Sequence, residues 1–150
     1  MEERTLVMVK PDGVMRLLVG EVISRLEKKG LRLAGMKMLW LTREQAEEHY
    51  AEHAGKPFFP AMVDFIVSAP VVAMVWEGPG AIRAVRDLMG ATDPAQAAPG
   101  SLRGSLAVHI TRNVVHASDS AQSAEREIGL YFSPQEIFSY LRPADAWLKE

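Results

Sequence analysis

The sequence of 150 residues contains no cysteine, which excludes disulfide bonds, thiolate metal ligands and a cysteine nucleophile. It has no uninterrupted apolar run of the roughly 18 residues that a membrane-spanning helix needs, so we expect no membrane partner. The start, Met1-Glu2-Glu3-Arg4, carries two acids where a secretory signal has a basic segment. These absences together predict a cytoplasmic protein.

An excess of basic charge is also absent, because 17 Lys and Arg face 19 Asp and Glu for a net charge of −2. Nucleic-acid binding usually needs a basic excess or a basic face, so we expect no specific nucleic-acid partner. Small anions remain possible ligands because they need only a few local cations. The 48% hydrophobic content is typical of a globular protein, and the length predicts a single domain over residues 1–150.

The common phosphate and nucleophile motifs are missing as well. No G-x-x-x-x-G-K-[ST] segment is present, which excludes a P-loop. Gly78-Pro79-Gly80 lacks the third glycine of a dinucleotide fingerprint and is typical of a turn. The segment 100–104 places its serine one position away from that of a nucleophile elbow. Any nucleotide chemistry must therefore use another arrangement.

Periodicity and turn residues predict four strands, over 5–9, 31–41, 71–76 and 105–110. Helices are predicted over 14–29, 43–49, 60–68 and 81–89, with a further one beginning after Ser120. Gly30 is expected to end the first helix, and Thr42 with Gln45 forms a capping box for the second. Residues 90–104 lack apolar periodicity and are expected to form a long functional loop.

This order predicts an α+β fold, namely the ferredoxin-like βαββαβ sandwich with a four-stranded antiparallel sheet. A helical pair is inserted between the second and third strands, and a C-terminal helix and tail follow the fourth. The nearly all-apolar third strand indicates a position that is central or covered on both faces.

The four histidines are the first candidates for chemistry. His49 and His53 are four residues apart and could form a metal pair on one helix face, although no third ligand is evident. His109 fits a partly exposed strand position. His116 follows the fourth predicted strand in a turn rich in polar residues, where catalytic groups concentrate. Composition alone leaves a solvated turn residue as an equal alternative for His116.

Several cations could hold phosphate: Lys10, Arg86, Arg103 and Arg112. Taken singly, each is as well explained as a solvated surface charge. Phe58-Phe59 is most simply part of the core, but one exposed ring there could stack a nucleobase.

The segment Asn113-Val-Val-His116-Ala117-Ser118-Asp119-Ser120 resembles the N-x-x-H-G-S-D-S signature around the phosphorylated histidine of nucleoside diphosphate kinases. The resemblance continues in register along the chain. The matching segments are 9–14, 49–53, 56–59, 70–78, 90–95, 99–104 and 124–129. It implies a kinase that moves the terminal phosphate of a nucleoside triphosphate to a nucleoside diphosphate.

The resemblance implies a role for each matching residue. His116 is implied as the nucleophile through Nδ1, Glu127 as the group that orients its ring, and Ser118 as the support of that glutamate. The remaining implied groups are Lys10, Tyr50 and Asn113 for the sugar 3′-hydroxyl and the transferred phosphate, Arg86, Thr92 and Arg103 for the β- and γ-phosphates, His53 for the α-phosphate, and Phe58 for stacking on the base. Ile110 is a further predicted nucleotide-binding residue. Asp119 is implied to meet Mg²⁺ through water.

A phosphohistidine intermediate implies ping-pong kinetics, because donor and acceptor use one site in turn. Stacking without hydrogen-bond recognition implies broad tolerance of base and sugar. Relatives form hexamers or tetramers, and the segment 140–150 resembles that of hexameric members, so a hexamer is expected and a tetramer is the alternative. The chain departs from the family at Leu17, Ala91, Ser105 and Ala117. A methyl group at position 117 could disfavour a positive φ or crowd the histidine.

Two rival functions stay open at this point. The first is a nucleotide-binding scaffold that has lost catalysis, against which the intact set of implied residues argues. The second is a nucleic-acid-binding ferredoxin-like domain, which needs aromatic residues on an open sheet and a basic face.

Overall fold

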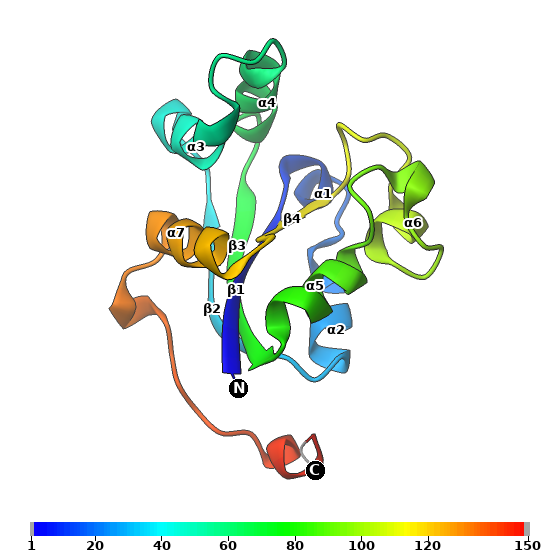
Figure 1. Ribbon diagram of the computed structural model, residues 1–150, viewed down its shortest axis with the longest axis vertical. Helices are drawn as coiled ribbons and strands as arrows, with labels where there is room; N and C mark the ends of the chain where they lie inside the picture. Colours follow the sequence, from blue (N-terminus) through cyan, green and yellow to red (C-terminus); the bar gives the residue numbers. More distant parts are fainter. Residues whose placement is uncertain (1, 149–150) are drawn as a thin grey trace.

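The computed structural model describes residues 2–148, so Met1 and the last two residues of the predicted tail lie outside the description. Its centre is a four-stranded sheet of β1 (Glu2–Val9), β2 (Arg32–Leu39), β3 (Val71–Pro79) and β4 (Val115–Ala117). The strands stand in the order β2-β3-β1-β4, and all neighbours are antiparallel (Figure 1). This arrangement confirms the predicted α+β, ferredoxin-like fold.

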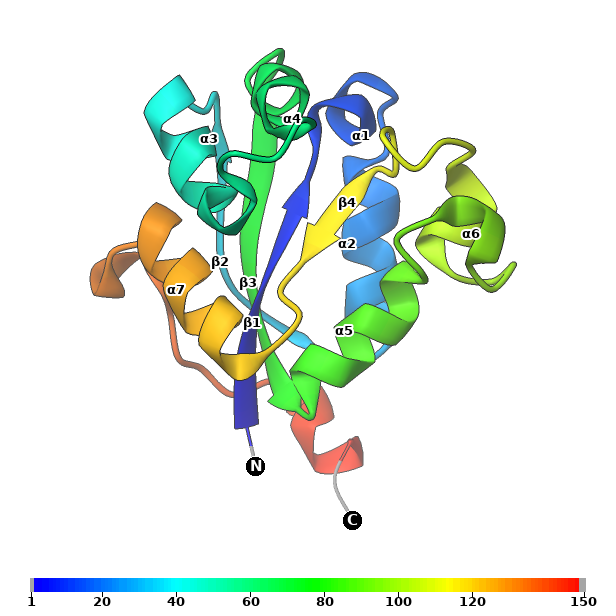
Figure 2. The same cartoon turned by 45° about the horizontal axis from the view of Figure 1, so that its top comes forward.

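Helices cover both faces of the sheet (Figure 2). On one face, α2 (Val19–Lys28) and α5 (Ala81–Met89) pack on alternate strand residues such as Val7, Met74 and Trp76. On the other face, α3 (Arg43–His49), α4 (Phe59–Ile66) and α7 (Ala121–Tyr131) pack on the intervening residues, such as Leu6 and Val75. Because side chains alternate along a strand, β3 is buried on both faces, as its apolar sequence predicts. The sheet therefore offers no open face for nucleic acid.

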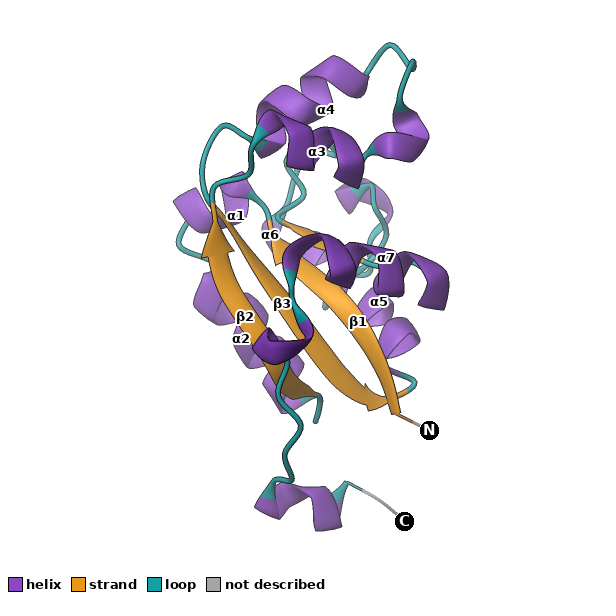
Figure 3. Cartoon of the chain, turned by 90° about the vertical axis from the view of Figure 1, so that its left-hand side faces the viewer, coloured by secondary structure: helices purple, strands orange, loops and turns teal. Residues whose placement is uncertain are grey.

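Helix α3 and helix α4, joined through the short helix η1 (Ala51–His53), form the predicted insertion between β2 and β3. They stand at one end of the sheet, beyond α7 (Figure 3). The predicted capping box is confirmed, because the Thr42 hydroxyl accepts from the Gln45 N–H and the Gln45 side chain accepts from the Thr42 N–H. Ser120 likewise caps α7 by accepting from the Ser123 N–H.

The predicted strand over 105–110 is wrong. Residues Leu102–Leu106 form helix α6, and the loop before it contains the short helix η2 (Pro94–Gln96). Ser101 begins α6 by accepting from the Gly104 N–H, a capping bond that the alternation of apolar residues does not reveal. Val108 and Ile110 are exposed, so their alternation has no core face beneath it. The fourth strand lies at 115–117, where His116 pairs with Met8 of β1.

The predicted helix over 14–29 is interrupted. It divides into α1 (Pro11–Met15) and α2, because Leu17 between them adopts a φ of 61°. That conformation costs an L-residue about 1–2 kcal/mol relative to glycine. Gly30 ends α2 with a φ of 100°, as predicted. Ala117 does not adopt the positive φ that its methyl group would disfavour, since Leu17 and Val114 are the non-glycine residues with positive φ in the described chain.

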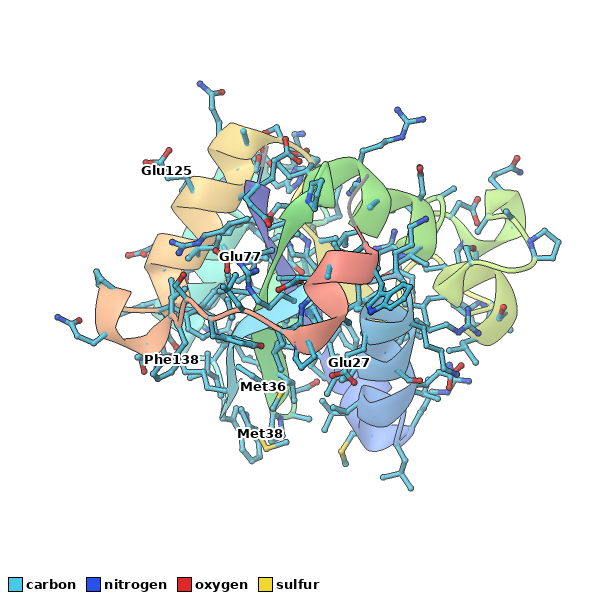
Figure 4. All side chains as sticks on the ribbon, turned by 90° about the horizontal axis from the view of Figure 1, so that it is seen from below. Glu27, Met36, Met38, Glu77, Glu125 and Phe138 are labelled. Carbon is cyan, nitrogen blue, oxygen red and sulfur yellow. The ribbon has the colours of Figure 1, made fainter. Side chains whose placement is uncertain are left out.

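After α7 the chain forms η3 (Pro134–Glu136), crosses beside β2 and ends in η4 (Pro143–Trp147). The Phe138 N–H donates to the Ala34 carbonyl at 2.8 Å, which fixes this segment to the sheet. Figure 4, which views the molecule from below, labels Phe138 of this segment together with Met36 and Met38 of β2. Within residues 2–148, no helix is both long enough and apolar enough to cross a membrane.

Candidate functional site

A cavity of about 770 Å³ opens between the α3–α4 insertion and the segments leading into α6 and β4. It gathers residues that are far apart in the sequence. The predicted site residues that line it are Lys10, Tyr50, His53, Phe58, Arg86, Thr92, Arg103, Ile110, Asn113, His116, Asp119 and Glu127. Ser118 does not line the cavity, because it is fully buried behind Glu127. The structure therefore brings the whole predicted set to one place.

His116 lies within β4 and not in a turn beyond a strand. The predicted strand over 105–110 ended before this position, so the prediction placed His116 in the following turn. Its Nε2 is 2.8 Å from Oε1 of Glu127 on α7, and the Ser118 hydroxyl donates to the same oxygen at 2.8 Å. Burial alone would raise the pKa of Glu127, but the hydrogen bonds from His116 and Ser118 hold it below its ordinary value. An ionised carboxylate accepts only, so Nε2 carries a proton, and in the neutral ring Nδ1 keeps its lone pair.

His49 packs directly against His116, a placement that the sequence analysis missed. The two ring centroids are 4.6 Å apart in an edge-to-face arrangement, and His49 Nδ1 lies 2.7 Å from the Tyr131 hydroxyl. Burial lowers the pKa of His49 to about 3. His49 is therefore neutral, and its ring forms part of the packing around His116. The metal pair considered for His49 and His53 does not form, because His53 lies on η1 beside Phe58.

The inner wall of the cavity is cationic. Lys10 Nζ donates to Asn113 Oδ1 at 2.7 Å, while Arg103 donates to backbone carbonyl groups, including Val115 at 2.6 Å. Arg86 donates to the Ala117 carbonyl at 3.3 Å. In the described chain, none of these three cations forms an ion pair with a carboxylate. Burial lowers the pKa of Lys10 to about 8, and burial followed by the charge of Arg86 lowers that of Arg103 to about 10.

Such desolvated, unneutralised cations favour an anionic ligand, because an anion restores the interactions that burial removed. Asn113 strengthens the wall by donating from Nδ2 to the Thr92 carbonyl at 2.9 Å. The cavity is therefore suited to phosphate groups.

The turn after β1 holds this wall in place. The Asp12 carboxylate accepts from the Val114 N–H at 2.9 Å, and the Val114 carbonyl accepts from the Lys10 N–H at 2.9 Å. Val114 itself has a φ of 74°, an unfavourable conformation for a β-branched residue that two backbone bonds and full burial maintain. The Pro11-Asp12-Gly13 segment reads as a plain turn in the sequence, but in the structure it fixes the residue next to Asn113.

The outer rim of the cavity carries both apolar and charged side chains. Phe58 and Ile110 are about half exposed, at 48% and 52%. Asp119 is exposed at the rim, and a hydrogen bond from the Ser123 hydroxyl lowers its pKa, so it is ionised. Rim residues that the sequence analysis did not name as ligands are Glu52, Met62 and Phe65.

One cluster among the described residues has the composition of a metal site. Donor atoms of His49, His116 and Glu127 lie within 4.8 Å of one another. Each zinc ligand lies about 2.0–2.2 Å from the metal, so two donor atoms on one zinc ion are closer to each other than the 4.8 Å limit that defines this cluster. Oε1 of Glu127 is also already shared between His116 and Ser118. The cluster is accounted for by the orientation of His116.

Comparison with known proteins agrees with this site. The profile of the family described as nucleoside diphosphate kinase matches residues 3–137. The nucleoside diphosphate kinase of Archaeoglobus fulgidus is 64% identical over 148 residues, which cover 99% of this chain and 98% of the relative. That of Heliobacterium modesticaldum is 60% identical over 148 residues, which cover 99% of each chain.

Solved structures give the same result. A halophilic nucleoside diphosphate kinase from Halobacterium salinarum in complex with CDP superposes with a TM-score of 0.98 at 51% identity, covering 100% of both chains. A nucleoside diphosphate kinase family protein from Babesia bovis has a TM-score of 0.95 at 46% identity, covering 98% of this chain and 99% of its own. This chain therefore belongs to the nucleoside diphosphate kinase family and is an enzyme of that type, which transfers phosphate between nucleotides.

Proposed function

We propose that the enzyme passes the terminal phosphate of a nucleoside triphosphate to a nucleoside diphosphate through a phosphate carried on Nδ1 of His116. The observation that carries the proposal is the 2.8 Å contact between His116 Nε2 and the ionised Glu127. That contact occupies one ring nitrogen, and among the described residues the other has no hydrogen-bonding partner. The nucleophilic nitrogen thus belongs to a ring that lines a cavity with Arg86 and Arg103.

In the first step, the Nδ1 lone pair forms a bond to the γ-phosphorus while the bond from that phosphorus to the β–γ bridging oxygen breaks. The electron pair leaves with the nucleoside diphosphate. The ring gains positive charge, which Glu127 stabilises through Nε2–H. In the second step, a terminal oxygen of another nucleoside diphosphate attacks the phosphorus, the N–P bond breaks and neutral His116 returns. Donor and acceptor use the same cavity in turn, so ping-pong kinetics follow.

The phosphate-binding roles follow from the cationic wall. We assign Arg86, Thr92 and Arg103 to the β- and γ-phosphates, because the two guanidinium groups, which form no ion pair within residues 2–148, suit bidentate binding of phosphate oxygens. His53 is assigned to the α-phosphate, nearer the rim. This division places the strongest charge where charge develops during transfer.

The sugar and the transferred phosphate are assigned to Lys10, Tyr50 and Asn113. Lys10 and Asn113 are already joined at 2.7 Å, which preorganises both side chains. Burial, followed by the charge of Glu127, raises the pKa of Tyr50 to about 12, so its hydroxyl stays protonated and can donate. None of these groups requires a 2′-hydroxyl, so ribose and deoxyribose nucleotides are both expected as substrates.

Phe58 and Ile110 are assigned to the nucleobase. Their half-exposed apolar surfaces can stack on either side of a ring, and every base has a π-face. We therefore expect broad tolerance of the base. The relative from Halobacterium salinarum was solved with CDP, a pyrimidine nucleoside diphosphate, which is compatible with such a slot.

Mg²⁺ is the cofactor that fits this site. The ion prefers phosphate oxygens and water to an all-protein cage, and Asp119 is an exposed, ionised carboxylate at the rim that can reach it through water. When bound with the nucleotide, Mg²⁺ neutralises charge on the phosphate oxygens.

We infer that the chain assembles as a hexamer, with a tetramer as the alternative. The strand β2 lies at the edge of the sheet and carries exposed Met36 and Met38, and Phe138, which donates to the Ala34 carbonyl on this strand, is 64% exposed. Exposed apolar side chains at the edge of a sheet favour association with another copy. Light scattering in solution tests the assembly. A cytoplasmic location stays a prediction.

The transfer itself is tested by incubating the enzyme with γ-labelled ATP in the absence of an acceptor. We expect one acid-labile phosphate per chain, which ADP or GDP then removes. His116→Ala is expected to abolish labelling, and His109→Ala, which changes an exposed histidine outside the cavity lining, serves as the matched control. Wild-type protein that binds nucleotide but is never labelled would instead support a binding scaffold.

A further inference from the structure

Arg112 is a cavity residue that the assignments above do not use, although the sequence marks it as a cation. It lies in the segment 107–113 between α6 and β4, where the Arg112 N–H donates to the His109 carbonyl at 3.1 Å. The same segment carries Ile110 at the cavity rim. Within residues 2–148, the Arg112 side chain forms no ion pair with a carboxylate, and its Nη1 donates to the carbonyl of the adjacent Thr111 at 3.1 Å. That bond stays within the segment, so a contact with another element is needed to hold the segment in place.

That contact is the ring of Phe65 on α4. The Arg112 guanidinium carbon lies 4.0 Å from the ring centroid, and Lys10 Nζ lies 5.7 Å from the same ring. Both distances are within the range of a cation–π interaction, and the shorter one is that of a stacked guanidinium. Phe65 thus meets two cations that come from the segments opposite α4.

The stack joins the two walls of the cavity. Helix α4 stands over one end of the sheet, and the chain leading into β4 approaches this end from the α6 side (Figure 2). Phe58 immediately precedes α4 and Ile110 lies on the opposite segment, so the gap between them depends on how the helix and the segment are held together. In the described chain, no hydrogen bond or ion pair joins α4 to residues 107–113. The Arg112–Phe65 stack is the directional contact that crosses from one to the other.

We propose that Arg112 is a positioning residue, which stacks on Phe65 to hold α4 and the 107–113 segment at the separation that grips a nucleobase between Phe58 and Ile110. This inference rests on the proposed assignment of the base. It differs from a phosphate-binding role for Arg112, which the residue's charge and its place in the cavity also permit. The two roles differ in whether a ligand without a base is affected.

The test is calorimetric titration of each variant with ADP and with inorganic pyrophosphate, which has no base. We expect Arg112→Gln and Phe65→Leu each to weaken ADP binding by about 2- to 30-fold, the range that one cation–π contact supplies. Arg112→Gln should leave pyrophosphate binding unchanged, and it is the deciding variant because Phe65 also contacts Lys10. The double variant should be no weaker than the weaker single variant, because both changes remove the same contact. Arg112→Lys should rescue only part of the loss, because an ammonium group does not stack as a plane.

Arg43→Gln is the matched control. It removes an exposed arginine that pairs with Asp64 on the outer side of α4, at 2.6 Å, and it leaves the cavity intact. We expect it to leave both affinities unchanged. Thermal unfolding of each variant shows whether Phe65→Leu keeps its fold, and the exposed Arg112 provides a change that does not disturb the core.

The inference is overturned if pyrophosphate binding weakens with ADP binding and Arg112→Lys restores both, which would make Arg112 a phosphate ligand. It is also overturned if Arg112→Gln leaves ADP affinity unchanged. Because the titrations do not require phosphate transfer, their outcome is independent of the labelling experiment. If the calorimetric titrations give the expected affinities but His116 takes up no labelled phosphate, the proposed transfer is refuted and the positioning role of Arg112 stands.

Discussion

Replacing Glu127 with glutamine removes one charge from the contact that orients His116. Glu127 is 95% buried, with an exposed fraction of 5%, and its Oε1 accepts two hydrogen bonds of 2.8 Å, from His116 and Ser118. A glutamine oxygen can accept both bonds in the same geometry, so the change is mainly from charge-assisted to neutral bonds. Hydrogen bonds to charged groups contribute about 1.5–3 kcal/mol and neutral ones about 0.5–1.5 kcal/mol.

The bond to His116 is the one that strengthens during transfer, because the ring becomes positive. We therefore expect the transition state to lose about 1–2 kcal/mol, which slows phosphoenzyme formation by about 5- to 30-fold. Quenched-flow labelling with γ-labelled ATP measures this rate. Nucleotide affinity should stay constant, because the carboxylate holds the ring and not the nucleotide. A wild-type rate in Glu127→Gln, or a loss confined to affinity, would refute this account of how His116 is oriented.

The same substitution has a consequence for stability. The pKa of Glu127 is lower in the folded protein than its ordinary value of 4.5. A lowered carboxyl pKa contributes stability that is fully present above the unfolded pKa and is lost as pH falls through the folded value. The stability difference between wild type and Glu127→Gln should therefore be constant above about pH 5 and shrink below pH 4.5, as urea unfolding at several pH values would show. A difference that grows on acidification would contradict this assignment.

Three further predictions follow from individual residues. Because burial lowers the pKa of Lys10 to about 8, pyrophosphate affinity should fall as pH rises through that value, and Lys10→Arg should remove most of the fall in a calorimetric series. Leu17→Gly should raise the free energy of unfolding by about 0.5–1 kcal/mol, because relief of the positive φ exceeds the entropy that glycine costs; an unchanged urea midpoint would count against strain there. Gly104→Ala should lower stability by about 1–3 kcal/mol, since its Cβ would lie 2.0 Å from the Ala98 carbonyl oxygen; equal melting temperatures would contradict this steric argument.

The sequence predicted the fold where local signals agree with tertiary packing. The first and third strands alternate or run apolar because helices cover both faces of the sheet, and the Thr42 capping box is a local signal that the structure confirms. The prediction of a strand over 105–110 was wrong because the alternation of Leu106, Val108 and Ile110 does not distinguish a strand from the end of a short helix followed by an exposed segment. Only packing against β1 places the fourth strand at His116.

The resemblance names the residues that the structure gathers at the candidate site, and the residues alone indicate them much less clearly. The cations and His116 could each have been solvated, and only the fold brings them to one cavity. His49 had no local signal, because its role depends on Tyr131, a residue 82 positions away, and on the ring of His116. Arg112 was visible as a cation, but its partner Phe65 lies on a separate element. Such contacts are set by tertiary structure, which composition and spacing do not encode.

The central claim is that Glu127 occupies Nε2 of His116 and leaves Nδ1 to take the phosphate. Heteronuclear NMR of the phosphoenzyme, trapped with ATP in the absence of an acceptor, identifies the nitrogen that is bonded to phosphorus. We predict phosphate on Nδ1 of His116 alone. Phosphate on Nε2, or on any other residue, would contradict the account.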